Sequence, residues 1–298
     1  YFFIIAASVL WGTIGILANF AYGFGVQPDV LIALRLSVGF GTLFIMLSLF
    51  SRGSLRVDRR DALVLLAFGI VGVTLQRLSY FCAVNLTTAT VAAILFYTYP
   101  VFLSIYAWLF FGEKLTLWDV LAIAFTFVGV AFVVRAYDVA VLRADVLGIA
   151  FGLASSLFFV VYFVLVRRLR GRYASWTITL CGDGIGALVL SPVIAVSFSE
   201  VAAFPWQVWL LVFVIAWFPS LLAYLLYSHA IKYVKAKGSV LSVMEPLSAA
   251  VFSTLLVGER FEVWQVLGIA LALAGVVLLF RRGVGPNPPR TQREHPEQ

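Results

Sequence analysis

Four ionisable side chains lie inside long apolar runs of this sequence, and they are the residues best placed to do chemistry. They are Arg35, Arg77, Asp183 and Glu245. A charged residue at the centre of a membrane helix costs about 2.5–3.5 kcal/mol on insertion scales, so it rarely faces lipid and commonly marks a substrate or proton pathway. The four residues therefore indicate a polar pathway within an apolar protein.

Glu245 stands next to Pro246, in an apolar run that holds no other charge after Lys237. Its carboxyl group can bind a substrate ammonium group, or it can carry a proton across a membrane. The alternative is a neutral, hydrogen-bonded carboxyl group that only fixes a kink in the chain.

Arg77, beside Gln76, can hold a substrate carboxylate through its guanidinium group. The alternative is an arginine near the end of its run whose charged head reaches water. Arg35 and Asp183 occupy nearly matching places in the two halves of the chain. For these two we expect structural pairing within each half rather than contact with a substrate.

Aromatic residues make up 16% of the chain, and several lie in the middle of apolar runs. Rings can stack on apolar groups or attract a cation, and tyrosine hydroxyls can bond polar ends of a ligand. The alternative is packing against lipid or a place in the interfacial belt. With Arg77 and Glu245, the predicted substrate-binding aromatic residues are Trp11, Tyr80, Tyr97, Tyr99, Phe158, Tyr162, Trp217 and Tyr224.

Three prolines, Pro100, Pro219 and Pro246, fall within apolar runs, and we predict kinks or hinges there. Proline removes a backbone donor and clashes with the preceding turn. The repeat mate of Pro219 is Gly72, and interruptions at matching places in two halves point to a binding region. A static kink that only improves packing is the alternative.

The composition of the chain indicates that the apolar runs that carry these residues are membrane helices. Hydrophobic residues form 63% of the chain, charged residues form 12%, and the mean hydropathy is +1.04. A bilayer span needs about 20 apolar residues in a helix. The sequence predicts an all-α membrane protein with ten spans, at residues 2–22, 30–50, 62–83, 89–111, 117–136, 146–166, 175–198, 207–229, 236–257 and 263–280. The polar tail, residues 283–298, is expected to be disordered and cytoplasmic.

The chain repeats itself at an offset of about 146 residues. Pro100 meets Pro246, Gly112-Glu113 meets Gly258-Glu259, and Trp118 meets Trp264. The repeats are predicted as residues 1–136 and 137–282. Because each holds an odd number of spans, five, the second must be inverted relative to the first, an arrangement typical of secondary transporters.

The positive-inside rule orients the predicted spans. If the N-terminus is cytoplasmic, 16 Lys and Arg residues lie on that side and 3 lie on the other. We therefore expect both termini in the cytoplasm.

These motifs together resemble the drug/metabolite transporter superfamily, in its ten-helix EamA-type branch. They are Leu10-Trp11-Gly12, Arg35, and Pro100 followed by Gly112-Glu113, with Glu245-Pro246 and Gly258-Glu259 in the second half. The resemblance implies export of amino acids or other small metabolites across a bacterial inner membrane. It also implies a central cavity lined mainly by spans 1, 3, 4, 6, 8 and 9, with spans 5 and 10 outside it. Aromatic amino-acid exporters are the members most similar in aromatic content.

Two other classes of function are alternatives to a carrier. An intramembrane enzyme would need a nucleophile pair, a metal motif or a phosphate loop, and the sequence contains none of these. A channel would need a continuous polar path, for which the spans offer too few polar residues. The expected protein is therefore a carrier by alternating access, acting as a monomer in the bilayer on a small-molecule substrate, with no cofactor, metal or nucleic acid.

Overall fold

Apolar sequence becomes helix along almost the whole chain. The computed structural model describes residues 2–112, 116–231 and 241–282. Among these residues there is no β-strand, because a backbone with no water beside it satisfies its polar groups most simply within one helix. The helices are α1 (Phe2–Gly12), α2 (Ile14–Gly23), α3 (Pro28–Phe50), α4 (Ala62–Ala67), α5 (Gln76–Leu86), α6 (Ala89–Phe96), α7 (Tyr99–Phe111), α8 (Leu117–Val133), α9 (Val139–Leu169), α10 (Ser175–Val196), α11 (Phe198–Ala203), α12 (Trp206–Ala216), α13 (Ala223–Ile231), α14 (Met244–Phe252) and α15 (Val263–Arg282).

Shorter helical segments join or interrupt these helices. The 3-10 turns include η1 (Arg52–Leu55) and η2 (Arg59–Asp61). Three are π-helical, η3 (Phe68–Leu75), η4 (Trp217–Leu222) and η6 (Ser253–Val257).

The all-α membrane class predicted from composition is confirmed. Seven continuous helical stretches in the described chain are long and apolar enough to cross a membrane, and three shorter apolar helices join them at Leu117–Val133, Leu241–Val257 and Val263–Leu279. The helical stretches overlap the predicted spans within the described residues. The inverted arrangement of ten spans stays a prediction, and the predicted tail lies outside the described residues.

Pro100 and Pro246 do not kink the middle of an uninterrupted helix. The run at 89–111 is broken at Tyr97–Thr98, and Pro100 stands in the first turn of α7. Pro246 likewise lies in the first turn of α14. In a first turn the missing N–H of proline costs nothing, because that group has no partner within the helix. The break after α6 is held by the Thr98 hydroxyl, which donates to the Leu95 carbonyl at 2.7 Å.

Pro219 and Gly72 lie in π-helical segments at matching places in the two halves. In each segment a hydroxyl group donates to the carbonyl five residues earlier, Thr74 to Gly69 at 2.7 Å and Ser220 to Ile215 at 2.8 Å. A π-turn leaves its carbonyls poorly matched to the usual donors, so the hydroxyl group supplies a missing hydrogen bond.

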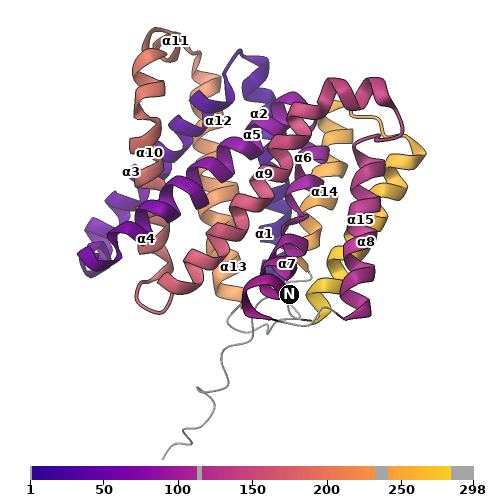
Figure 1. Cartoon of the computed structure of the whole chain (residues 1–298). Coiled ribbons are helices and arrows are strands. Elements are labelled where there is room, and N and C mark those ends of the chain that lie inside the picture. Colours follow the sequence, from indigo (N-terminus) through magenta and orange to yellow (C-terminus); the bar gives the residue numbers. More distant parts are fainter. Residues whose placement is uncertain (1, 113–115, 232–240, 283–298) are drawn as a thin grey trace, which may run out of the picture.

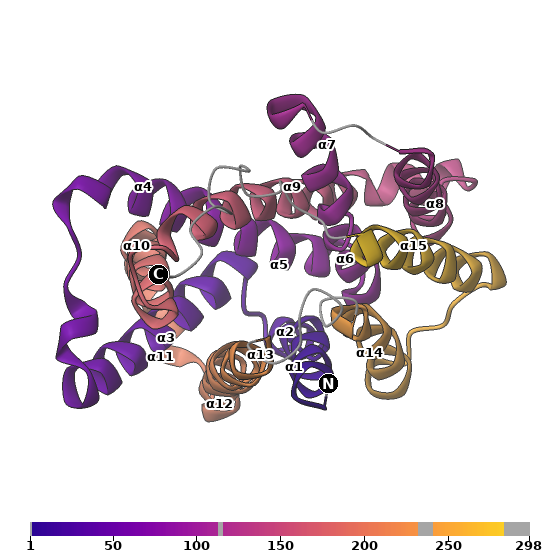
Figure 2. The same cartoon turned by 90° about the horizontal axis from the view of Figure 1, so that it is seen from below.

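The helices form two facing rows, which are seen best from below (Figure 1, Figure 2). Seen from below, α1, α12, α13 and α14 lie along one side, and α4, α5 and α9 lie along the other (Figure 2). The helices α3 and α10 pack together at one end, and α8 packs against α15 at the other. Side chains from both rows point into the space between them.

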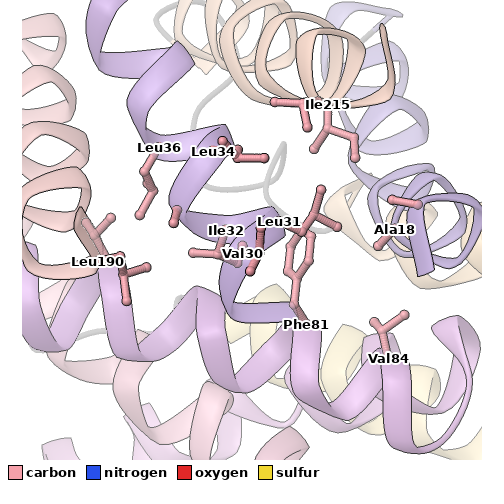
Figure 3. Packing of buried hydrophobic residues seen from close by; sticks show 14 of the residues in the cluster. Ala18, Val30, Leu31, Ile32, Leu34, Leu36, Phe81, Val84, Leu190 and Ile215 are labelled. Atoms are coloured by element: carbon pink, nitrogen blue, oxygen red, sulfur yellow. The ribbon is translucent and has the colours of Figure 1, made fainter. Parts of the chain in front are cut away.

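In the largest hydrophobic cluster, α3 packs between helices of the two rows. Figure 3 shows Phe81 rising from α5 toward Leu31 of α3, with Ile215 of α12 above them. All three side chains are buried. This packing fixes the height and rotation of α3, the helix that carries Arg35.

Candidate binding cavity

A cavity of about 560 Å³ lies between the two rows and is lined by both halves of the chain. Its walls come from α1, α2, α3, α5, α6 and α7 in the first half and from α9, α10, α12, η4, α13 and α14 in the second. This volume falls in the range of pockets that take small organic molecules. The helices α8 and α15 contribute no lining residue, whereas α3 and α10, which the resemblance did not place at the cavity, do contribute.

Most of the predicted substrate-binding residues line this cavity. They are Trp11, Arg77, Tyr80, Tyr97, Tyr99, Tyr162, Trp217, Tyr224 and Glu245, and Pro219 joins them. Pro100 and Pro246 are not among the lining residues.

Phe158 is not a lining residue either, and its neighbour Phe159 takes that place. One position along an α-helix turns a side chain by about 100°, so two adjacent phenylalanines cannot share a face. The sequence alone could not decide which of the pair points inward.

Phe96 is the centre of an aromatic cluster in the cavity wall. Its ring lies 5.8 Å from Tyr80, 5.6 Å from Tyr99 and 5.0 Å from Phe159, measured between ring centroids. Phe159 in turn stacks almost parallel on Tyr162, at 5.1 Å and 9°. These separations are those of attractive aromatic pairs, so the wall is rigid and presents ring faces and edges.

Arg77 forms an ion pair with Asp183, with 2.6 Å between Nη1 and Oδ1. Arg77 lies on α5 and Asp183 on α10, so the ion pair joins the two halves. The expectation of pairing within each half was wrong for Asp183. Repeat positions that match in sequence need not be neighbours in space, and here α10 packs on α3 and η3 of the other half.

Arg35 is buried and lines the same cavity from α3. Its Nη2 donates to the Ser220 hydroxyl at 2.7 Å, and its guanidinium carbon lies 5.4 Å from the centre of the Phe81 ring. Both contacts cross between helices distant in sequence. Sequence reasoning placed Arg35 outside the site because its matching position to Asp183 suggested a structural pair.

Glu245 is linked to Tyr97 through the tyrosine hydroxyl group. The hydroxyl oxygen of Tyr97 lies 2.9 Å from Oε2 of Glu245 and 2.5 Å from the backbone carbonyl oxygen of Ser242. Within the described chain, no basic residue forms an ion pair with Glu245. The acid therefore meets hydroxyl and aromatic groups in this structure.

Several lining residues were missed from the predicted site, among them Phe81, Phe159, Ser220 and Tyr227. The repeat offers a signal for one of them, because Tyr227 is the mate of Tyr80, which also lines the cavity. The ring of Tyr227 lies 5.2 Å from that of Trp11.

The cavity's polar groups suit an organic ligand rather than a metal. In the part of the chain that the structure describes, no three His, Cys, Asp or Glu side chains gather closely enough to hold a metal ion. The groups that face the cavity are guanidinium groups, two carboxyl groups and aromatic rings. Such a set can orient a small molecule that has both charged and apolar parts.

Comparison of the sequence with known protein families identifies one family that matches both halves of the chain. The model of the EamA-like transporter family matches the chain twice, over residues 1–135 and 146–281. The chain belongs to the EamA-like transporter family. An EamA-like chain with an aromatic cavity between its two matched segments is a multi-pass membrane transporter, as the sequence predicted.

Curated relatives of this EamA-like protein are transporters by name. An uncharacterized transporter of Archaeoglobus fulgidus is 29% identical, with 93% of this chain and 95% of the relative covered. The uncharacterized inner membrane transporter YicL of Salmonella typhimurium is 27% identical, with 93% of each covered. A solved crystal structure of a protein 19% identical covers 93% of this chain and 96% of its own, with a TM-score of 0.62, and so has the same fold.

Proposed function

We propose that this protein is a secondary carrier that exports amino acids, aromatic ones included, or related small metabolites across a bacterial inner membrane by alternating access. The observation that carries the proposal is the cavity lined by both halves of the chain. A site shared by two halves is exposed to one side or the other when the halves rock against each other. Export is the direction that the family resemblance implies.

The double match of the family model supports two homologous halves of five spans each, at residues 1–136 and 137–282. In this proposal the halves are inverted, and an inverted pair can form two mirror-related states of similar energy. The membrane named for YicL supports the inner membrane as the location. The charge distribution along the sequence supports cytoplasmic termini.

The cavity walls support a substrate with an apolar or aromatic body. Phe96 and its ring neighbours offer edges and faces for stacking, which stabilises a bound ring by about 0.5–1.5 kcal/mol for each good pair. The sequence predicted Arg77 and Glu245 as partners of a carboxylate and an ammonium group, and both residues line the cavity. An amino acid with an aromatic side chain carries all three features.

Transport by purified protein in liposomes tests the proposal. With a panel of labelled amino acids, we expect accumulation of aromatic members above that in protein-free liposomes. Phe96→Ala should raise the KM about two- to tenfold, since one or two ring pairs are lost. The matched control is Phe125→Ala on α8, an exposed ring outside the cavity, which should leave the KM unchanged.

Folded protein that accumulates no labelled amino acid from the panel would remove the proposal. If Phe96→Ala and Phe125→Ala change the KM equally, the cavity is not the substrate-binding site, although the protein is still a transporter.

A further inference from the structure

We infer that the Arg35 end of the cavity is an anion subsite, which takes the carboxylate of an organic acid whose apolar body rests on the aromatic wall. The inference rests on the proposed carrier function and makes its substrate class narrower. It assigns the selecting role to Arg35 rather than to Arg77, the residue that sequence reasoning favoured.

The two arginines differ in how their charge is balanced. Arg77 is paired with Asp183 at 2.6 Å. In the described chain, no carboxylate forms an ion pair with Arg35, whose hydrogen bond goes to the neutral hydroxyl group of Ser220. Three charged groups at this end of the cavity therefore sum to one positive charge. A buried charge without a counter-ion is costly, and a bound anion removes that cost.

Arg35 is also held in a fixed orientation. Ser220 accepts from Nη2 of Arg35 at 2.7 Å and donates its own proton to the Ile215 carbonyl at 2.8 Å. The Phe81 ring lies against the guanidinium carbon at 5.4 Å and is itself packed under Leu31 (Figure 3). A guanidinium group held on one edge and one face keeps its remaining N–H groups available as a rigid fork for a carboxylate.

Two further arginines, Arg167 and Arg170 near the C-terminal end of α9, line the same cavity. Among the described lining residues, Arg35, Arg77 and Arg170 already outnumber the acids Asp183 and Glu245. The excess of positive charge raises the local concentration of anions and opposes the entry of cations. Glu245, which bonds to Tyr97, has no arginine partner in the described chain. Neither acid in the cavity wall forms an ion pair with Arg35 in the described chain.

Three probes with the same phenyl ring and different charges test this subsite. They are phenylpropionate, an anion; phenylalanine, a zwitterion; and phenethylamine, a cation. Equilibrium binding to the solubilised, purified full chain should give similar affinities for the two carboxylated probes. Phenethylamine should bind at least about tenfold more weakly, since it lacks the charge-assisted hydrogen bonds.

Substitutions then assign the effect to Arg35. Arg35→Gln should weaken both carboxylated probes by about ten- to a hundredfold, the loss expected for hydrogen bonds to a charged group. The affinity for phenethylamine should stay the same or increase. Arg35→Lys keeps the charge and loses the fork, so it should recover part of the affinity. Asp183→Asn adds to the surplus of positive charge and should not weaken the carboxylated probes.

Thermal unfolding of each variant shows whether it is folded, and Arg35→Lys keeps the test open if Arg35→Gln fails to fold. The inference is overturned if phenethylamine binds as well as phenylpropionate, if neither carboxylated probe binds, or if both arginine variants bind them like the parent protein. Binding without any transport in liposomes would instead remove the carrier proposal and keep the anion subsite. Transport of amines at a rate that substitution of Arg35 does not change would remove the anion subsite and keep the carrier proposal.

Discussion

Tyr97 has one hydroxyl proton and meets two oxygen atoms, the Ser242 carbonyl at 2.5 Å and Oε2 of Glu245 at 2.9 Å. A carbonyl oxygen can only accept. When the Tyr97 proton goes to Ser242, the contact with Glu245 is a hydrogen bond only if Glu245 holds a proton and donates it. The Tyr97 proton can instead go to the Glu245 carboxylate, so the same geometry accommodates Glu245 with or without a proton, as a proton-carrying residue requires.

Glu245→Gln tests this role at the level of one residue. The glutamine N–H₂ group can donate to Tyr97 as a protonated carboxyl group does, so the variant should remain folded. Since glutamine cannot release a proton, transport should lose its dependence on pH. Uptake into liposomes at acidic, neutral and alkaline pH measures this. A variant whose pH profile equals that of the parent protein would retire the proton-carrier idea.

Residue chemistry alone indicated most of the cavity, because charged and aromatic groups in the middle of apolar runs have few other places to go. It failed where rotation about a helix axis decides the outcome, as for Phe158 against Phe159. It also failed for Arg35, since its partner Ser220 lies far away in sequence and is an ordinary residue in a membrane helix. Long-range packing, which no local pattern encodes, brings these two together.

At the scale of elements, α8 and α15 pack with their backbones almost in contact. A Cβ atom added to Gly129 of α8 would collide with the backbone nitrogen of Ala272, and it would lie 2.6 Å from the Gly268 carbonyl oxygen. Small residues allow close approach of this kind, and in lipid such packing replaces the hydrophobic effect as the main attraction between helices.

Gly129→Ala should therefore destabilise the protein, although alanine favours a helix by about 1 kcal/mol over glycine. Backbone atoms cannot move aside as a flexible side chain can, and overpacking costs about 1–3 kcal/mol. The matched control is Gly41→Ala on α3, where an added Cβ meets nothing within 4 Å. Thermal unfolding in detergent should show a lower midpoint for Gly129→Ala alone. Equal midpoints for the two variants would contradict the close packing.

The positions of the helices could be read from hydropathy, but their interruptions could not. Thr98 breaks the predicted run at 89–111, and η3 and η4 widen two others. These irregular turns depend on single hydroxyl groups that bond backbone carbonyls within a helix. Serine and threonine often make such bonds without breaking a helix, so their presence in a sequence does not announce a π-turn.

At the scale of the whole molecule, two loops from different halves meet at one end. Arg172 donates to Oδ1 of Asp61 at 2.7 Å, and the Tyr173 hydroxyl donates to Oδ2 at 2.7 Å. The bond to the Asp61 carboxylate raises the pKa of Tyr173, so the phenol keeps its proton and remains a donor. Both loops are rich in arginine, and we expect both in the cytoplasm.

Single cysteines test this orientation. In a chain with Cys82 and Cys181 replaced by serine, Gly53→Cys and Gly171→Cys should react with a membrane-impermeant maleimide only in inverted vesicles. Gly23→Cys should react in intact cells. Added side chains at all three positions meet nothing within 4 Å, so accessibility is not limited by packing. Labelling of all three from the same side would refute the inverted arrangement.

The two matched π-turns bear on the history of the chain. Thr74 bonds Gly69 and Ser220 bonds Ile215, each across five residues and at one constant offset between the halves. Two independent insertions would have had to arrive at the same place with the same kind of hydroxyl residue. A single insertion in an ancestral half-length gene, followed by fusion of two copies, needs only one event. On that account the widened turn is older than the chain, and in the present chain its second copy supports Arg35 of the first half through Ser220.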